Sequence, residues 1–288
     1  MAEQARFRPI LVRLLEGRVG STLVMQLLGT SADVQFDRVY PFENSYLTYF
    51  TRLVGRISAA RAPDATMVEF LYGDATRVGP LPFAPEHLSR DALARDSLRG
   101  VWHAFSNGVR ATTGGGVSWY AEKYWGDVSP VIAAGLDPVV IDLVRDPRDI
   151  VASIRAFNAK TGRELFGRAR ARDDRAHLRR MVAGMSFRLQ EFAAPLPVGH
   201  LVIRYEDLVS DLPGQASRLE DALGVRLDVA ALTPGGDEMD RHMTSPSPES
   251  SVGRWTRDLP SEDVEAIERA LGDAMTALGY FLSSAQRR

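Results

Sequence analysis

The stretch Arg13-Leu14-Leu15-Glu16-Gly17-Arg18-Val19-Gly20-Ser21-Thr22-Leu23-Val24-Met25 decides the fold. Its first residues end an apolar run that predicts a β-strand over 9–15, and its last residues predict a helix over 20–28. In the turn between them, Gly17 and Gly20 let the main chain approach a ligand closely. Successive backbone N–H groups and the positive end of the helix dipole favour an anion there. The turn therefore predicts an anion-binding site.

The composition is that of a globular protein without a strong overall charge. Of the 288 residues, 45% are hydrophobic, and 35 lysines and arginines face 37 acidic residues, so nothing in the net charge favours nucleic acid or an anionic membrane as a partner. The chain has no cysteine, which excludes disulfides, thiolate catalysis and thiolate metal sites. Charged residues interrupt the apolar run near the N-terminus, so we expect no secretory signal, no membrane span and a cytoplasmic location.

Short apolar runs separated by longer helical stretches predict a parallel sheet flanked by helices. We expect one three-layer α/β/α domain over 1–288, with strands at 9–15, 117–120, 138–144 and 200–204. The helices are expected at 20–28, 41–57, 85–112, 147–159, 173–193, 213–223 and 261–278. The clearest helix start is at Asp146-Pro147, where an N-cap side chain precedes proline at the first helical position.

A nucleotide kinase with a P-loop is one interpretation of the anion-binding turn. Such a loop ends in adjacent Gly-Lys-Ser/Thr, so that the lysine reaches the terminal phosphates and the hydroxyl holds magnesium. Here Gly20 is followed directly by Ser21, and the cation, Arg18, comes two residues before the glycine. Asp142, at the end of an apolar strand, could support magnesium. The kinase remains an alternative, but the turn does not favour it.

The segment 18–22 instead resembles the first motif of the PAPS-dependent sulfotransferase superfamily: a strand, a basic residue, a variable residue, glycine and two hydroxyl or small residues that open a helix. The resemblance is to the bacterial and Golgi-type branch. It implies a P-loop-like turn that binds the 5′-phosphosulfate of PAPS without a metal. Backbone N–H groups supply the contacts, and two hydroxyls add donors; the residues are Gly17, Arg18, Val19, Gly20, Ser21 and Thr22.

A second segment, 142–153, is similar to the superfamily's 3′-phosphate motif. The resemblance assigns Arg145, at a strand end, and Ser153, eight residues later on the following helix, to one phosphate. A guanidinium fork and a hydroxyl donor suit that role. The alternatives are a surface ion pair of Arg145 with Asp146 or Asp149, and packing of the serine against the sheet.

Two later segments continue the resemblance in the expected order. Residues 202–208 are similar to a strand-end Tyr-Glu-Asp segment that places Tyr205 near the adenine, and the acidic residues also suit the first turn of a following helix. Residues 250–255 are similar to a Ser-x-Gly-Arg-Trp segment that closes over the 3′-phosphate. There Gly253 permits backbone approach and Arg254 supplies charge.

Members of the superfamily transfer a sulfuryl group from PAPS to a hydroxyl or amine and release PAP. The resemblance makes Arg18 the cation that stabilises charge on the leaving oxygen; cytosolic members carry lysine there, and arginine cannot act as a general acid. We expect a small-molecule, lipid or carbohydrate acceptor. A catalytically silent PAP-binding module is the second alternative, and the sequence does not indicate an oligomeric state.

The acceptor's proton needs a base, and no histidine follows the strand at 117–120. We predict Glu43, expected at the start of the second helix, although helix capping explains an acid there equally well. Asp37 and Glu122 are the other candidates. Lys123 is predicted to place a compact charge near the sulfuryl group, because only two of the 35 basic residues are lysines. Its alternative is a surface ion pair.

Seven arginines lie between Arg163 and Arg180, which indicates either a solvated helix or a lid that binds an acidic acceptor or covers the cofactor. The acceptor pocket is expected from 36–50, 70–103 and the loop before Ser250. Aromatic residues in those stretches suit either a pocket or the core: Tyr40, Tyr46, Tyr49, Tyr72, Phe83 and Trp102.

Overall fold

A computed structural model describes residues 7–58, 87, 89–113, 116–194, 199–232 and 243–283. The chain falls into two compact units. Unit 1 comprises 1–11 and 32–139, and unit 2 comprises 12–31 and 140–288. The single domain over 1–288 stays a prediction. The predicted stretch 70–86, with Tyr72 and Phe83, lies outside the described residues.

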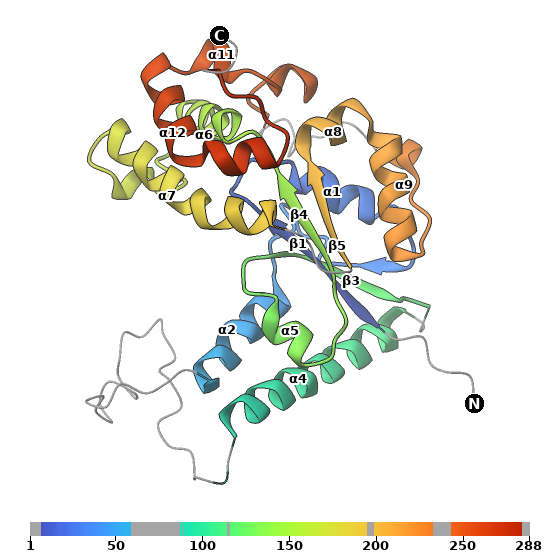
Figure 1. Ribbon diagram of the computed structural model, residues 1–288. Helices are drawn as coiled ribbons and strands as arrows, with labels where there is room; N and C mark the ends of the chain where they lie inside the picture. The colour runs from blue at the N-terminus through green and yellow to red at the C-terminus, as the bar shows by residue number, and fades with distance from the viewer. Residues whose placement is uncertain are drawn as a thin grey trace. The chain divides into compact units, whose positions relative to one another are not determined.

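The five strands form one sheet in the order β2-β3-β1-β4-β5 (Figure 1). Their bounds are β1 Arg8–Leu14, β2 Val34–Gln35, β3 Trp119–Tyr124, β4 Val139–Val144 and β5 His200–Arg204. β2 is parallel to β3, with Val34 opposite Trp119, and β4 is parallel to β5, with Val140 opposite His200. The predicted α/β class with a parallel sheet is confirmed. The sequence missed β2 because a strand of two residues has no readable alternation.

Unit 1 contains α2 Tyr46–Ser58, α4 Arg90–Thr113 and α5 Ser129–Ala133. Its core includes Trp102, whose ring stacks on Phe7 at 5.4 Å and whose indole N–H donates to the Phe7 carbonyl at 3.4 Å. Of the aromatic residues expected in the acceptor pocket, Trp102 therefore serves the core, and Tyr49 is 64% exposed.

The start of α2 corrects the sequence prediction, which placed it at residue 41. Residues 41–45 are not helical, and Phe42 has a φ of 63°. The carboxylate of Glu122, on β3, accepts the N–H groups of Leu47 and Thr48, both at 2.8 Å. Because these are N–H groups of the first helical turn, Glu122 caps α2 and fixes its start at Tyr46.

Unit 2 holds the remaining long helices, among which α12 packs against α6 and α7 (Figure 1). As predicted, Asp146 caps α6 by accepting the N–H of Arg148 at 2.9 Å, with Pro147 as the first helical residue. The α-helices are α1 Ser21–Leu28, α6 Pro147–Thr161, α7 Asp174–Ala193, α8 Tyr205–Ser210, α9 Leu212–Leu223, α11 Trp255–Asp258 and α12 Ser261–Ala277. Three short 3-10 helices are η1 Arg168–Arg170, η2 Val229–Ala231 and η3 Glu249–Ser251. No helix among the described residues is long and apolar enough to cross a bilayer.

Candidate functional site

The turn between β1 and α1 is shaped by two aromatic rings. Gly20, the N-cap of α1, has a φ of 87°, and a Cβ there would lie 2.5 Å from the ring of Tyr205. A Cβ at Gly17 would lie 2.3 Å from the ring of Phe166. Both positions therefore require glycine for the approach of rings from distant segments. No side chain caps α1, so the positive end of this helix is not covered by a capping group.

Arg18 connects the first predicted motif to the second. It has a φ of 69°, and its Nε donates to Ser153 Oγ at 3.2 Å, across 135 residues of sequence. Its guanidinium lies 4.8 Å from the ring centre of Phe157, which is four residues after Ser153 on the same helix, α6. The structure thus brings Arg18 and Ser153 together on unit 2.

Arg145 follows β4 and is buried, with 3% of its surface exposed. It donates to the carbonyls of Arg18 at 2.9 Å and Ser251 at 2.7 Å, and its guanidinium lies 4.3 Å from the ring centre of Tyr205. Its Nε is buried and has no hydrogen-bond partner among the described residues. A buried N–H donor lowers the stability of the fold unless an acceptor, such as a bound ligand, takes its hydrogen bond.

Arg145 does not form the surface ion pair that was its alternative, because it is buried and because Asp146 and Asp149 bind other groups. Asp146 binds Arg148, and Asp149 accepts the N–H groups of Gly253 at 2.7 Å and Trp255 at 2.9 Å. Burial raises the pKa of Asp149 to about 6. This carboxylate therefore anchors the segment 250–255 to the start of α6.

Arg254 is buried at the end of the same segment and is tied to a pair of hydroxyls. It donates to Thr244 Oγ1 at 2.9 Å and to Ser245 Oγ at 3.1 Å, and it pairs with Asp258 at 2.7 Å. Thr244 Oγ1 also lies 3.4 Å from Ser153 Oγ. The hydroxyls of Thr244 and Ser245 were missed by the sequence, because small polar residues in a proline-rich loop carry no periodic signal.

Tyr205 lies at the centre of this cluster in unit 2. Its ring is in contact distance of both the Gly20 position and the Arg145 guanidinium, and its hydroxyl is 3.0 Å from Ser251 Oγ. Ser251 is the serine of the Ser-x-Gly-Arg-Trp segment, for which the sequence predicted no separate role. The cluster combines buried arginines with hydroxyls, main-chain N–H groups and the uncovered end of α1, a set that favours an anion of more than one charged group.

In unit 1, Lys123 and Glu43 form a pair. The Lys123 side chain is only 2% exposed, its Nζ donates to the Pro41 carbonyl at 2.6 Å and lies 3.8 Å from Glu43 Oε1. Burial lowers the pKa of Lys123 to about 8. Lys123 is therefore not a surface residue, whereas the Glu43 side chain is 63% exposed. The expectation that Glu43 opens a helix is wrong, because α2 begins three residues later under the cap from Glu122.

Glu122 accepts three hydrogen bonds from residues of α2. Besides the two backbone N–H groups, it accepts the Thr48 hydroxyl at 3.0 Å. Burial raises its pKa to about 7, against the lowering effect of these hydrogen bonds. Its carboxylate is thus held by helix α2.

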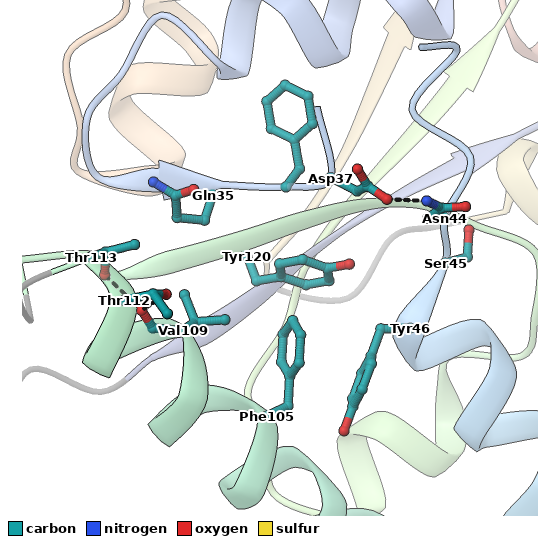
Figure 2. Close-up of a pocket in the computed structure, with 11 residues that line it drawn as sticks. Gln35, Asp37, Asn44, Ser45, Tyr46, Phe105, Val109, Thr112, Thr113 and Tyr120 are labelled. Carbon is teal, nitrogen blue, oxygen red and sulfur yellow. Dashed lines mark hydrogen bonds between the residues drawn. The ribbon is translucent and has the colours of Figure 1, made fainter. Parts of the chain in front are cut away.

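A cavity of about 520 Å³ lies within unit 1 (Figure 2). Of the three carboxylates considered from the sequence, only Asp37 lines it. Tyr46 lines it too, as the stretch 36–50 predicted, together with Phe105 and Tyr120.

The arginine-rich segment in unit 2 spans η1 and the start of α7. Arg168 pairs with Asp174 at 3.2 Å, and Arg180 donates to the Arg170 carbonyl at 3.0 Å. Phe166, within this segment, contacts the Gly17 position and lies 5.9 Å from the ring of Phe157. The segment is therefore packed on the turn, and its action as a lid stays a prediction.

One family model matches the chain, and solved structures share its fold. A family model described as "Sulfotransferase family" matches residues 16–229. The sulfotransferase domain from the curacin biosynthetic pathway is 19% identical, with a TM-score of 0.52 over 96% of this chain and 99% of that one. The sulfotransferase domain from the Synechococcus PCC 7002 olefin synthase is 16% identical, with a TM-score of 0.53 over 97% and 98%. These two likenesses show a shared fold. No curated protein matches the sequence.

Proposed function

The chain belongs to the sulfotransferase family, and from this premise we propose that it moves a sulfuryl group from PAPS to an acceptor hydroxyl or amine and releases PAP. The choice of PAPS as the sulfuryl donor depends on one observation. Arg145 is buried beside Tyr205 with an unpartnered Nε, next to the contact between Arg18 and Ser153. A 3′-phosphate would accept from that Nε and from the hydroxyl of Ser153.

The other residues of the cluster suit the rest of PAPS. The N–H groups of Val19, Gly20, Ser21 and Thr22 would hold the 5′-phosphosulfate at the start of α1, and the hydroxyls of the last two add donors. Tyr205 would lie against the adenine. Gly253 and Arg254 would close over the 3′-phosphate, in a segment that Asp149 anchors.

PAPS supplies an activated sulfuryl group, and the leaving oxygen gains negative charge as its bond to sulfur breaks. Arg18 is the cation that we assign to this oxygen. Arginine stays protonated at any working pH, so it stabilises charge without delivering a proton. The ring of Phe157 beneath the guanidinium and the bond to Ser153 hold Arg18 in one orientation.

Two carboxylates in unit 1 are candidates for the base that takes the acceptor's proton. Glu43 is the sequence-based choice, and it is paired with Lys123, which we assign to the transferred sulfuryl group. Asp37 is the second, because it lines the cavity. Glu122 is poorly suited, because it is only 2% exposed and its carboxylate caps α2.

Calorimetry with PAP tests this proposal. PAP should bind in the presence of EDTA, because the cluster supplies its own cations, and added magnesium should change the affinity less than about threefold. No binding of PAP, together with binding of ATP only in the presence of magnesium, would contradict the proposal and favour the kinase alternative. A protein that binds PAP tightly but transfers no sulfuryl group to any of a broad set of alcohols and amines would be the silent PAP-binding module.

A further inference from the structure

The cavity of unit 1 has one continuous aromatic wall. Figure 2 shows the rings of Tyr120 from β3, Phe105 from α4 and Tyr46 from α2 along one side of it. The rings of Phe105 and Tyr120 meet edge to face at 4.7 Å, and those of Tyr46 and Phe105 stack at 4.0 Å. Their mutual packing fixes their orientation, so the wall is preformed. Such a surface favours a flat aromatic body.

The lining of the cavity also carries an oriented carboxylate, that of Asp37. Asp37 Oδ1 accepts the N–H of Val39 at 2.9 Å, and Oδ2 accepts the side-chain amide of Asn44 (Figure 2). A carboxylate oxygen has two lone pairs, so each oxygen can still accept one hydrogen bond. Asp37 can therefore receive an O–H from a molecule in the cavity.

Four hydroxyls of the cavity lining already donate to main-chain carbonyls. The Tyr46 hydroxyl donates to the Val101 carbonyl at 3.0 Å, and that of Ser45 to the Lys123 carbonyl at 2.7 Å. Thr112 and Thr113 both donate to the carbonyl of Val109 within α4, at 2.8 and 2.9 Å. Asp37 is thus the strongest hydrogen-bond acceptor that the described lining offers.

Charge narrows the class of ligand further. Asp37 is the one acidic residue in the described lining, which includes no lysine, arginine or histidine. A carboxylate or phosphate ligand would lie beside a like charge with no cation to balance it. The volume of about 520 Å³ falls in the range of small-molecule sites, roughly 300–1,000 Å³. The lining therefore excludes an anionic ligand on charge, and its size and rings suit a small aromatic molecule.

We propose that this cavity binds a neutral aromatic alcohol, with its ring against Phe105 and Tyr120 and its hydroxyl donating to Asp37. The inference rests on the proposed function, in which this molecule is the sulfuryl acceptor, and it narrows the acceptor class. It also argues against the acidic acceptor that was one alternative for the arginine-rich segment.

Calorimetry or ligand-detected NMR with 2-naphthylmethanol tests the binding. We expect 2-naphthylmethanol to bind at least about tenfold more tightly than cyclohexylmethanol, which has no aromatic ring, and than 2-naphthoate, which adds a negative charge. Equal binding of either comparison compound would overturn the inference. Tighter binding of the cationic 2-naphthylmethylamine would contradict the choice of a neutral ligand.

Two tryptophan variants of α4 locate the site. Val109→Trp puts a large side chain into the cavity and should weaken 2-naphthylmethanol binding at least tenfold. Ala104→Trp makes the same change at an exposed position of the helix and should leave binding within about twofold. Asp37→Asn should weaken binding about fivefold or more, since a neutral amide is a weaker acceptor than a carboxylate. Retained binding in Val109→Trp would place the ligand elsewhere and refute the proposal.

PAP calorimetry on the same variants separates this inference from the proposed function. Val109→Trp and Asp37→Asn should bind PAP as the parent protein does, because the proposed PAP site is built from unit 2. If PAP binds and 2-naphthylmethanol does not, the cavity inference fails and the proposed function stands. If PAP fails to bind the parent protein, the proposed function fails, whatever the cavity binds.

Discussion

Replacing Arg145 by alanine should remove the 3′-phosphate contact of the proposed site. The guanidinium is buried over the ring of Tyr205, and its Nε is the donor that lacks a partner among the described residues. A hydrogen bond to a charged group contributes roughly 1.5–3 kcal/mol. Since about 1.4 kcal/mol corresponds to tenfold in affinity, we expect the Kd for PAP to rise roughly 10- to 100-fold in Arg145→Ala.

The assay is calorimetry with PAP and with 5′-AMP, which lacks the 3′-phosphate. Arg145 also donates to the carbonyls of Arg18 and Ser251, so its loss will loosen the site for both ligands. Loss of the 3′-phosphate contact should weaken PAP binding alone, so the affinity for PAP should fall more than the affinity for 5′-AMP. The ratio of PAP to 5′-AMP affinity should therefore fall at least about tenfold.

Arg204→Ala is the matched control for this experiment. Arg204 belongs to the same unit, its guanidinium lies 4.5 Å from the ring centre of Tyr280, and its Nε is likewise buried without a partner among the described residues. Its removal should leave the PAP to 5′-AMP ratio within about threefold. An equal loss of both ligands in Arg145→Ala, or an equal fall of the ratio in Arg204→Ala, would refute the assignment of Arg145.

Three further predictions follow from the site and its surroundings. Burial raises the pKa of Glu122 from 4.5 to about 7, so the folded state binds this proton more tightly than the unfolded state does. The free energy of unfolding should therefore fall by up to about 3 kcal/mol as the pH rises from about 4.5 to about 7. Glu122→Gln should therefore flatten the fall of Tm between pH 5 and 8, and an unchanged slope in thermal unfolding would contradict this. Gly20→Ala combines a φ of 87° with a Cβ 2.5 Å from Tyr205, so it should lower both Tm and PAP affinity; a variant with the parent's Tm would show that the turn tolerates a side chain. Sulfuryl transfer with saturating substrates should drop roughly 10²- to 10⁴-fold in whichever of Asp37→Asn and Glu43→Gln removes the base, and kcat values near the parent's in both variants would exclude both residues.

The sequence predicted those parts of the molecule that depend on local pattern. The start of α6 was readable, because Asp146-Pro147 combines a capping side chain with the proline that first helical positions accept. The contact of Arg18 with Ser153 was not predicted, because the resemblance assigned these two residues to different ends of PAPS. Arg18 follows β1, and Ser153 lies on α6, which follows the neighbouring strand β4. Because the carboxyl ends of parallel strands share one edge, the sequence indicates that the two segments are near each other, but not that these two side chains meet.

Contacts between distant segments could not be predicted in this way. In the sequence, Glu122 follows the predicted strand at 117–120, and nothing near it shows that its partners, Leu47 and Thr48, are about seventy-five residues away. Because of this long-range cap, α2 begins at Tyr46 instead of the predicted residue 41, and Glu43 lies outside the helix. The glycines of the turn were expected to make room for a ligand, whereas Gly20 also makes room for the ring of Tyr205.

A crystal structure of the protein soaked with PAP tests the central claim most directly. The account predicts the 3′-phosphate within hydrogen-bond distance of Arg145 and Ser153, and the 5′-phosphate against the N–H groups of residues 19–22. PAP bound at another surface, or with its phosphates away from both groups, would contradict it.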